Sequence, residues 1–313
     1  MMAIYTQLQE SDLQEISVRY NLTIVDYETV SGGATNSNYL VRAQQGRYVL
    51  TVFEDKTFNQ TVELGQLLLL LEEHLFPTTR PLFAGNGEIA IMHKGIPVMA
   101  KKYVEGEVYR YLSNGMLHQV GAAMARLHQV PVPSFLSSRH PYGVLKFPSI
   151  QGQNIDTEYE TWIAQRFSYF EQQKPQGLPR GLIHGDLFYD NVLFEGRRLK
   201  AIIDFEATTC EDNVFDLGMG IVGMCGVGTG VVLEKARALV SGYEQVRELE
   251  AREKRALQMF VEYAAATVSC WRYWKYHIDE PREENADKHR QMAQVAEEIR
   301  CVPKAKFSEV VFG

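Results

Sequence analysis

The sequence predicts an α+β fold of two lobes, a small antiparallel β lobe with one long helix and a larger, mainly helical lobe. Short strand-like runs separated by glycines dominate roughly the first hundred of the 313 residues. After Gly106 the apolar residues instead recur at helical spacing. We therefore expect an N-terminal lobe of residues 1–104 and a C-terminal lobe of residues 105–313.

The N-terminal lobe is expected to contain a sheet because its strand-like runs are rich in β-branched and aromatic residues. These runs cover residues 23–30, 39–43, 48–53, 88–93 and 97–104. Residues 57–76 predict the long helix, since their apolar side chains have helical spacing and Pro77 follows directly. Ser11 and Gln14 have the spacing of a capping box and predict a short helix before Tyr20.

Helical periodicity dominates the C-terminal lobe. It predicts helices at residues 114–129, 157–172, 232–247, 253–277 and 284–300. Between them, residues 192–194 and 200–203 have strand-like composition. We expect these two segments to form a short hairpin that turns at Glu195 and Gly196.

The composition is that of a globular protein, with 45% hydrophobic and 23% charged residues and a formal net charge of −7. An acidic surface repels nucleic acid and anionic lipid, so neither is an expected partner. The longest aliphatic run, residues 67–71, is too short to cross a bilayer, and we expect a cytoplasmic protein. The four cysteines are too widely spaced for a metal-ligand pattern and predict free thiols.

The residues with the clearest chemical pattern lie between 181 and 204. His184, Asp186 and Asn191 have the spacing H-x-D-x-x-x-x-N, and Asp204 directly follows a second apolar strand. Phosphoryl transfer requires a carboxylate that takes the proton of the acceptor hydroxyl, and oxygen ligands that hold Mg²⁺ against the phosphates. Asp186 suits the first role, and Asn191 and Asp204 suit the second. The structural alternative is a solvated turn capped by an aspartate.

This segment resembles the catalytic loop of protein-kinase-like enzymes. Its H-G-D sequence and the D-F-E at residues 204–206 look like the aminoglycoside phosphotransferase and choline kinase superfamily. The resemblance implies a two-lobed protein-kinase-like fold, ATP and Mg²⁺ as cofactors, and a small-molecule hydroxyl as acceptor. It also implies that Asp186 is the catalytic base, that Asn191 and Asp204 bind Mg²⁺, and that His184 supports the loop.

Asp216, in the segment VFDLG, has two interpretations. In the superfamily that the chain resembles, an aspartate after the metal-binding one braces the catalytic loop by accepting backbone hydrogen bonds. Alternatively, Asp216 caps the amino end of a helix. Both roles are structural, and the sequence favours neither.

A glycine-rich segment, residues 31–39, lies between the first two predicted strands. Gly32 and Gly33 would let backbone N–H groups approach phosphates closely, and Asn36 and Asn38 could contact the phosphates or the loop. The spacing matches no known phosphate-binding motif, so a simple hairpin turn is the alternative. Because the catalytic motif is also present, we interpret the segment as part of a nucleotide site.

Thr51 occupies the third-strand position at which kinases generally have a Lys or Arg that binds the α- and β-phosphates. A threonine lacks this charge. The glutamate of the long helix that would pair with such a cation is expected to be Glu63. The candidate replacements are Lys56, Lys101, Lys102 and Arg42. Without a replacement the chain would be a nucleotide-binding regulatory pseudokinase, although its intact catalytic and metal-binding residues argue against this.

The segment Lys102-Tyr103-Val104 resembles the connection between the lobes of these kinases, where backbone groups bind adenine. The alternative is a strand end followed by a turn at Gly106.

The segments YVLTVFE, DLFYDNVLF and IIDFEATTCEDNVFDLG look like those of the bacterial homoserine kinases built on this fold. The resemblance covers most of residues 3–225 and implies homoserine as the first substrate candidate. The chain departs from that group at Gly185, where an alanine is usual, and at Glu206, where an aromatic residue is usual. An acidic residue beside the acceptor could bind an ammonium or sugar hydroxyls, so an amino sugar, choline or an aminoglycoside is the alternative acceptor. A protein kinase is disfavoured because no A-P-E sequence follows Asp204.

Residues 270–276 are rich in aromatic and basic side chains, including Trp271, Arg272 and Trp274. In one interpretation they form a pocket wall where Arg272 binds a carboxylate or a sugar. In the other, which the sequence favours, they form an aromatic core stripe from which Arg272 and Lys275 extend to solvent.

Overall fold

The computed structural model describes residues 6–30, 36–228 and 230–313. The chain divides into two compact units. The first unit comprises Met1–Gly106 with Lys200–Ile203, and the second comprises Glu107–Leu199 with Asp204–Gly313. Residues 200–203 therefore belong to the first unit, although the sequence-based boundary at residue 104 assigned them to the second lobe.

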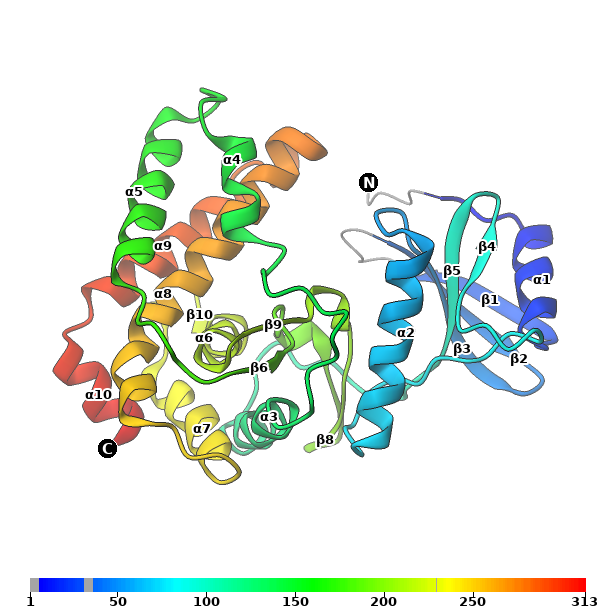
Figure 1. The fold of residues 1–313 in the computed structure, drawn as a ribbon, viewed down its shortest axis with the longest axis horizontal. Helices are drawn as coiled ribbons and strands as arrows, with labels where there is room; N and C mark the ends of the chain where they lie inside the picture. The colour runs from blue at the N-terminus through cyan, green and yellow to red at the C-terminus, as the bar shows by residue number, and fades with distance from the viewer. Residues whose placement is uncertain (1–5, 31–35, 229) are drawn as a thin grey trace. The chain divides into compact units, whose positions relative to one another are not determined.

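A five-stranded antiparallel sheet forms the centre of the first unit (Figure 1). Its strand order is β1-β2-β3-β5-β4, and each predicted strand is present. The strands are β1 (Ile24–Val30), β2 (Ser37–Ala43), β3 (Gly46–Val52), β4 (Ile91–His93) and β5 (Ile96–Lys102). In this register Asn38 lies opposite Thr51, and Thr51 lies opposite Met99, so these three side chains share one face of the sheet.

Two helices cover the opposite faces of this sheet (Figure 1). Helix α1 (Glu10–Arg19) buries Leu13 and Ile16 in a core shared with the strands, and helix α2 (Phe58–Glu73) packs on the other face. Gly65 of α2 approaches the sheet closely, because a Cβ there would lie 2.1 Å from Ile89 Cγ2 and 3.3 Å from Met99 Cε. The Thr51 face is thus the face that α2 covers. The predicted cap of α1 was wrong by two residues, since Gln9 N donates to Asp12 Oδ2 over 3.1 Å and precedes the first turn.

Helices make up most of the second unit. They are α3 (Asn114–Leu127), α4 (Phe147–Ile150), α5 (Thr157–Gln173), α6 (Asn213–Met224), α7 (Leu233–Glu244), α8 (Ala251–Trp274), α9 (Lys288–Cys301) and α10 (Lys304–Phe312). The five predicted helices are present as α3, α5, α7, α8 and α9. Helix α6 was not predicted because every one of its residues is buried, which leaves no alternation of polar and apolar faces. Gly218 lets α6 contact α8 closely, since a Cβ there would lie 2.6 Å from the Phe260 carbonyl oxygen.

Short strands and turns lie between these helices in the sequence. Strand β6 (Arg180–Ile183) pairs with β9 (Thr209–Asp212), and β7 (Val192–Glu195) pairs with β8 (Arg198–Ile202) in the predicted hairpin. A small ribbon is formed by β10 (Gly226–Val227) and β11 (Gly230–Val231). Helix α8 continues into a π-helical turn, Lys275–Asp279, and a 3₁₀ turn at Glu283–Asn285 precedes α9.

Within the described ranges, no helix combines the length and the apolar character needed to cross a membrane. All four cysteines are free thiols, as the sequence predicted.

Candidate active site

The predicted catalytic loop, residues 184–191, begins where β6 ends, and a buried aspartate of α6 fixes its first residues. Asp216 accepts hydrogen bonds from the backbone N–H groups of His184, over 3.0 Å, and of Gly185, over 2.8 Å. The N-cap of α6 is Asp212, so Asp216 does not cap the helix. Of the two interpretations of Asp216, the brace of the catalytic loop is therefore confirmed and the helix cap was wrong.

A buried histidine that the sequence did not single out holds Asp216 in turn. His128 Nε2 lies 3.0 Å from Asp216 Oδ2, and His128 Nδ1 lies 2.7 Å from the Tyr243 hydroxyl. Arg247 donates to the same hydroxyl over 3.1 Å. Because the Asp216 carboxylate can only accept, His128 donates to it from Nε2. His128 thus holds Asp216 in place, and Asp216 on helix α6 holds the loop.

Asp186 lies at the centre of this loop and is half-buried. Its backbone N–H donates to His184 Nδ1 over 3.2 Å, which supports the structural role implied for His184. The Tyr142 hydroxyl donates to Asp186 Oδ2 over 3.4 Å. Burial, with the negative charges of Asp204 and Asp190, raises the pKa of Asp186 to about 7. A carboxylate with such a pKa can accept a proton near neutral pH.

His140 contacts the catalytic loop from the segment that follows α3. Its Nε2 donates to the Gly185 carbonyl oxygen over 2.8 Å, and the Tyr142 N–H donates to its Nδ1 over 3.4 Å. Burial lowers the pKa of His140 to about 4, so the ring is neutral. His140 and Tyr142 could not be predicted, because isolated His and Tyr residues in an irregular segment match no motif.

Asn191 and Asp204 offer oxygen atoms that fit a hard cation. Asn191 Nδ2 donates to the Asp186 carbonyl oxygen over 2.8 Å, so its Oδ1 remains available. Asp204 is exposed and has φ 67°, in the left-handed region that Asp tolerates better than most residues. Among the described residues its carboxylate has no hydrogen-bond or ion-pair partner. One amide and one carboxylate suit Mg²⁺, which takes its other ligands from phosphates and water.

Arg272, at the end of α8, is half-buried and electrostatically coupled to the catalytic loop. Burial lowers its pKa, while the charges of Asp186 and Asp190 oppose this shift. Its positive charge in turn lowers the pKa of Asp186. The hydrogen bonds of its NH1 go to two neutral acceptors, the Lys288 carbonyl at 3.2 Å and Gln291 Oε1 at 3.3 Å. No described carboxylate forms an ion pair with Arg272.

The aromatic side chains around Arg272 correct the expectation of a plain core stripe. Tyr273 is fully buried, but Trp271 is half-buried with its ring 5.3 Å from that of Tyr142. Lys275 does not extend to solvent, because its side chain is 6% exposed and binds Asp279 and Glu280, each over 2.8 Å. One face of α8 is therefore core, whereas Trp271 packs beside Tyr142 and Arg272 hydrogen-bonds to residues of α9. Glu206 is half-buried, and its charge acts on the Tyr142 hydroxyl.

The predicted nucleotide-binding residues lie in the first unit. Gly32 and Gly33 lie outside the described residues. Asn38 Oδ1 accepts the Thr51 hydroxyl over 2.7 Å, and Asn36 Oδ1 accepts the Glu54 N–H over 3.2 Å. Thr51 is fully buried. It supplies no positive charge at the third-strand position where kinases generally have a Lys or Arg.

Backbone hydrogen bonds limit which groups of residues 102–104 are available to bind adenine. The Lys102 N–H donates to Arg80 O over 2.7 Å, and its carbonyl accepts the Thr79 hydroxyl over 2.6 Å. The Tyr103 N–H donates to Arg47 O over 3.0 Å. Among the residues that the structure describes, the Tyr103 carbonyl and the Val104 N–H have no such partner.

Comparison with known proteins identifies related enzymes. The profile of the phosphotransferase enzyme family matches residues 26–249. The chain is 29% identical over 290 residues to the homoserine kinase of Rhizobium meliloti strain 1021, covering 90% of this chain and 89% of that protein. The amicoumacin kinase hAmiN, solved with AMP-PNP and Ca²⁺, is 14% identical with a TM-score of 0.72 over 95% of both chains. The choline kinase LicA of Streptococcus pneumoniae is 20% identical, with a TM-score of 0.69 over 93% of this chain and 98% of that one.

The fold is protein-kinase-like, and the molecule is a phosphotransferase that acts on a hydroxyl group. The chain belongs to the phosphotransferase enzyme family and is a small-molecule kinase of that superfamily. Members of the family use ATP.

Proposed function

We propose that this enzyme transfers the γ-phosphoryl of ATP to the side-chain hydroxyl of homoserine. The observation that carries the proposal is Arg272, a half-buried guanidinium that acts on Asp186 and has no carboxylate partner among the described residues. A guanidinium in this position binds a carboxylate through two parallel hydrogen bonds. Homoserine carries one carboxylate, whereas choline and amino sugars carry none, so Arg272 favours an amino-acid acceptor.

The sequence relatives support the same acceptor. The similarity to the homoserine kinase of Rhizobium meliloti extends over 90% of this chain, so it includes both the catalytic loop and Arg272 in its span. The charge of Asp190 raises the pKa of Asp186, and the charge of Glu206 raises the pKa of Tyr142. These two carboxylates supply negative charge for the ammonium of an amino acid. The acidic Glu206 is thereby compatible with homoserine.

Asp186 has the role of the base in this proposal. The acceptor hydroxyl gives its proton to Asp186 as its oxygen bonds to the γ-phosphorus. The bond between that phosphorus and the bridging oxygen breaks, and ADP leaves with the electron pair. Because the Tyr142 hydroxyl donates to Asp186 Oδ2, Oδ1 is the oxygen that remains for the acceptor.

Asn191, through Oδ1, and Asp204, through its carboxylate, would hold Mg²⁺. When bound, Mg²⁺ neutralises the negative charge of the phosphates. The contact between Asn191 Nδ2 and the Asp186 carbonyl then keeps the metal ligand and the base at a fixed separation.

The first unit binds ATP in this proposal. Gly32 and Gly33 contact the phosphates through their N–H groups, together with Asn36 and the free Nδ2 of Asn38. The Tyr103 carbonyl and the Val104 N–H pair with adenine, rather than the backbone of Lys102, whose groups are already hydrogen-bonded.

The test measures ADP release from Mg-ATP with homoserine, 3-amino-1-propanol, choline and an amino sugar. 3-Amino-1-propanol is homoserine without its carboxylate and therefore isolates the contribution of Arg272. We expect homoserine turnover that Asp186→Ala reduces by about 10² or more. Arg272→Ala should raise the KM of homoserine by about 10- to 100-fold, as expected for a lost charged hydrogen bond, and leave the KM of ATP unchanged.

Three results would contradict the proposal in different ways. Turnover of choline or an amino sugar without homoserine would retain the kinase and reject the acceptor. Equal use of homoserine and 3-amino-1-propanol would reject the role of Arg272. Binding of ATP without turnover of any hydroxyl compound would identify a regulatory pseudokinase.

A further inference from the structure

The first turns of α9 supply the hydrogen-bond acceptors of the Arg272 guanidinium. Its NH1 donates to the Lys288 carbonyl over 3.2 Å and to Gln291 Oε1 over 3.3 Å. Gln291 Nε2 donates to the Gly228 carbonyl over 3.3 Å. The Gln291 amide thus connects Arg272 to the turn between β10 and β11.

The two partners of Gln291 fix which way its amide points. A carbonyl oxygen can only accept a hydrogen bond, so the NH₂ group must face Gly228. A guanidinium can only donate, so the amide oxygen must face Arg272. Both contacts require the same orientation, and a rotated amide would lose both.

Both acceptors behind Arg272 are uncharged. An amide oxygen and a backbone carbonyl orient the guanidinium but do not neutralise its positive charge, which remains available to bind an anion. A carboxylate at position 291 would satisfy the same geometry and neutralise that charge. The choice of glutamine therefore has a consequence for the ligand as well as for the arginine.

We propose that Gln291 is a positioning residue that orients Arg272 without neutralising it, and thereby makes the enzyme select acceptors that carry a carboxylate. This role rests on the proposed function, in which Arg272 binds the carboxylate of homoserine. Gln291 itself does not touch the acceptor and acts through Arg272.

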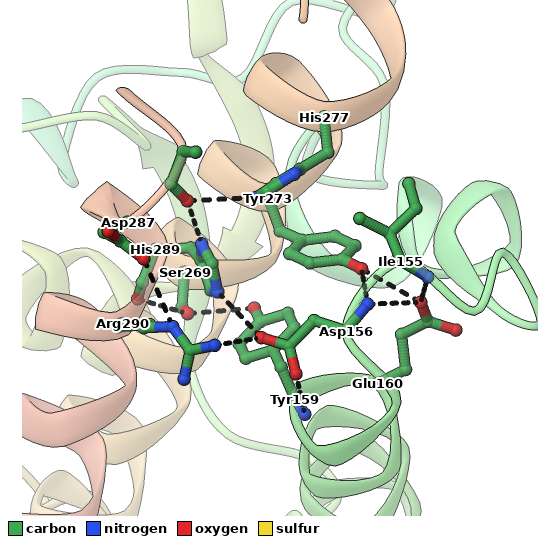
Figure 2. Close-up of polar contacts among 11 residues, drawn as sticks. Ile155, Asp156, Tyr159, Glu160, Ser269, Tyr273, His277, Asp287, His289 and Arg290 are labelled. Carbon is green, nitrogen blue, oxygen red and sulfur yellow. Dashed lines mark hydrogen bonds and ion pairs between the residues drawn. The ribbon is translucent and has the colours of Figure 1, made fainter. Parts of the chain in front are cut away.

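The beginning of α9 is itself anchored, which gives Gln291 and Lys288 a fixed base. Figure 2 shows His277 of the π-helical turn and His289 of α9 close together. Both rings bond to the Ala286 carbonyl. The two hydrogen bonds measure 2.9 Å for His277 Nε2 and 2.7 Å for His289 Nδ1. They connect the end of α8, which carries Arg272, to the start of α9, which carries Gln291.

A second set of contacts ties the same turn to α5. Arg290 forms ion pairs with Asp156, the N-cap of α5, over 2.5 Å and with Asp287 over 3.4 Å (Figure 2). Ser269 of α8 donates to the His289 carbonyl over 2.7 Å and bonds the Tyr159 hydroxyl over 2.9 Å. The first turn of α9 is therefore held from α5 and α8.

The experiment compares Gln291→Glu with Gln294→Glu in the full-length enzyme. Gln294 is exposed on the same helix, and its Nε2 contacts only Glu298 among the described residues, over 3.5 Å. Gln294→Glu therefore adds the same charge to α9 without a contact to Arg272. The probes are homoserine as substrate and 3-amino-1-propanol as alternative substrate or competitive inhibitor.

We expect Gln291→Glu to raise the KM of homoserine by about tenfold, because an exposed side chain contributes a modest ion pair. The KM or inhibition constant of 3-amino-1-propanol and the KM of ATP should not rise. Gln291→Ala should raise the KM of homoserine by about threefold, and Gln294→Glu should change none of these constants.

The outcomes separate this inference from the proposed function. Homoserine turnover with an unchanged KM in Gln291→Glu would overturn the role of Gln291 alone. An equal rise in the constants for homoserine and 3-amino-1-propanol would also overturn it, because it would indicate a general distortion of the site. A wild-type enzyme without homoserine turnover would overturn the proposed function, and the inference with it.

Discussion

His128 Nε2 lies 3.0 Å from Asp216 Oδ2, and both side chains are fully buried. The burial by itself would raise the pKa of Asp216, but the hydrogen bond and charge of His128 outweigh it, and the pKa is lowered. Asp216 is therefore ionised and can accept from two backbone N–H groups of the catalytic loop. The pair joins α3 to α6 and holds the loop that carries Asp186.

We expect Asp216→Asn to weaken both folding and turnover. The amide has one accepting oxygen instead of two, so one loop N–H or the His128 N–H loses its partner. A buried unsatisfied donor costs about 1–3 kcal/mol of unfolding free energy, which urea denaturation would measure. The same displacement of the loop should lower kcat by about tenfold or more. Asp26→Asn, at a carboxylate that is 65% exposed, is the matched control and should change neither quantity. Unchanged kcat in a destabilised Asp216→Asn enzyme would assign the pair to stability alone.

The sequence predicted the parts of this site that form a local pattern. His184, Asp186 and Asn191 are close in the chain and match one motif, H-x-D-x-x-x-x-N. His128, His140 and Tyr142 contact Asp216, Gly185 and Asp186, respectively, across 44 to 88 positions of the sequence. Contacts at such separations depend on how helices pack, and no spacing rule describes them.

The same reasoning explains the errors in helix assignment and in the aromatic stripe. Helix α6 is buried on all sides and so lacks the amphipathic signal on which the prediction of helices depends. Residues 270–276 have one pattern but two environments, because Tyr273 is in the core and Arg272 is half-buried and hydrogen-bonded to α9. Only the packing of α8 against its neighbours separates these environments.

The stability of the first unit should depend on pH through Asp12. Its carboxylate binds Lys94 Nζ over 2.6 Å, His93 Nε2 over 3.2 Å and the Gln9 N–H over 3.1 Å. Lys94 and Gln9 lower its pKa to about 2, and His93 adds to this against the effect of burial. Because the folded pKa lies below the unfolded value, the stabilisation is complete above about pH 4 and is lost as the pH falls toward 2.

Asp12→Asn should therefore destabilise the protein at pH 7, and the difference from the wild type should narrow as the pH falls below 4. Urea unfolding at pH 7, 5 and 3 would measure this. Asp26→Asn is the control, because its carboxylate is 65% exposed and its ion pair among the described residues is with the exposed Arg42. A loss for Asp12→Asn that is equal at pH 7 and pH 3 would show that its charge is not the cause.

A side chain at Gly185 would clash with its surroundings. Its φ is +81°, and a Cβ there would lie 2.6 Å from the Ala207 carbonyl oxygen and 2.8 Å from His140 Nε2. Gly185→Ala should cost about 2 kcal/mol or more of unfolding free energy, since the left-handed conformation alone costs about 1–2 kcal/mol. Its kcat should fall because Asp186 is the next residue.

A double-mutant cycle with His140→Ala would test this explanation. Removing the imidazole relieves one of the two close contacts, so Gly185→Ala should cost less in the His140→Ala background than in the wild type. Additive losses would mean that the Ala207 carbonyl and the backbone conformation account for the whole effect.

Lys101 is the basic residue that we expect to replace the missing cation at Thr51. In the sheet register Lys101 lies opposite Val49, so it shares the α2-covered face with Thr51, whereas Lys102 lies on the other face. Its ammonium is 5.9 Å from the centre of the Phe53 ring. Arg42 is a weaker candidate, because it is exposed and paired with Asp26 over 3.1 Å.

Lys101→Met should raise the KM of ATP by about 10- to 100-fold, which corresponds to one charged hydrogen bond to a phosphate, and leave the KM of the acceptor unchanged. Lys102→Met is the discriminating variant, because it removes the same charge from the next residue on the opposite face. A larger rise in the KM of ATP for Lys102→Met than for Lys101→Met would assign the cation to Lys102. If neither variant alters the KM of ATP, the α2-covered face does not supply the charge, and Lys56 becomes the next residue to substitute.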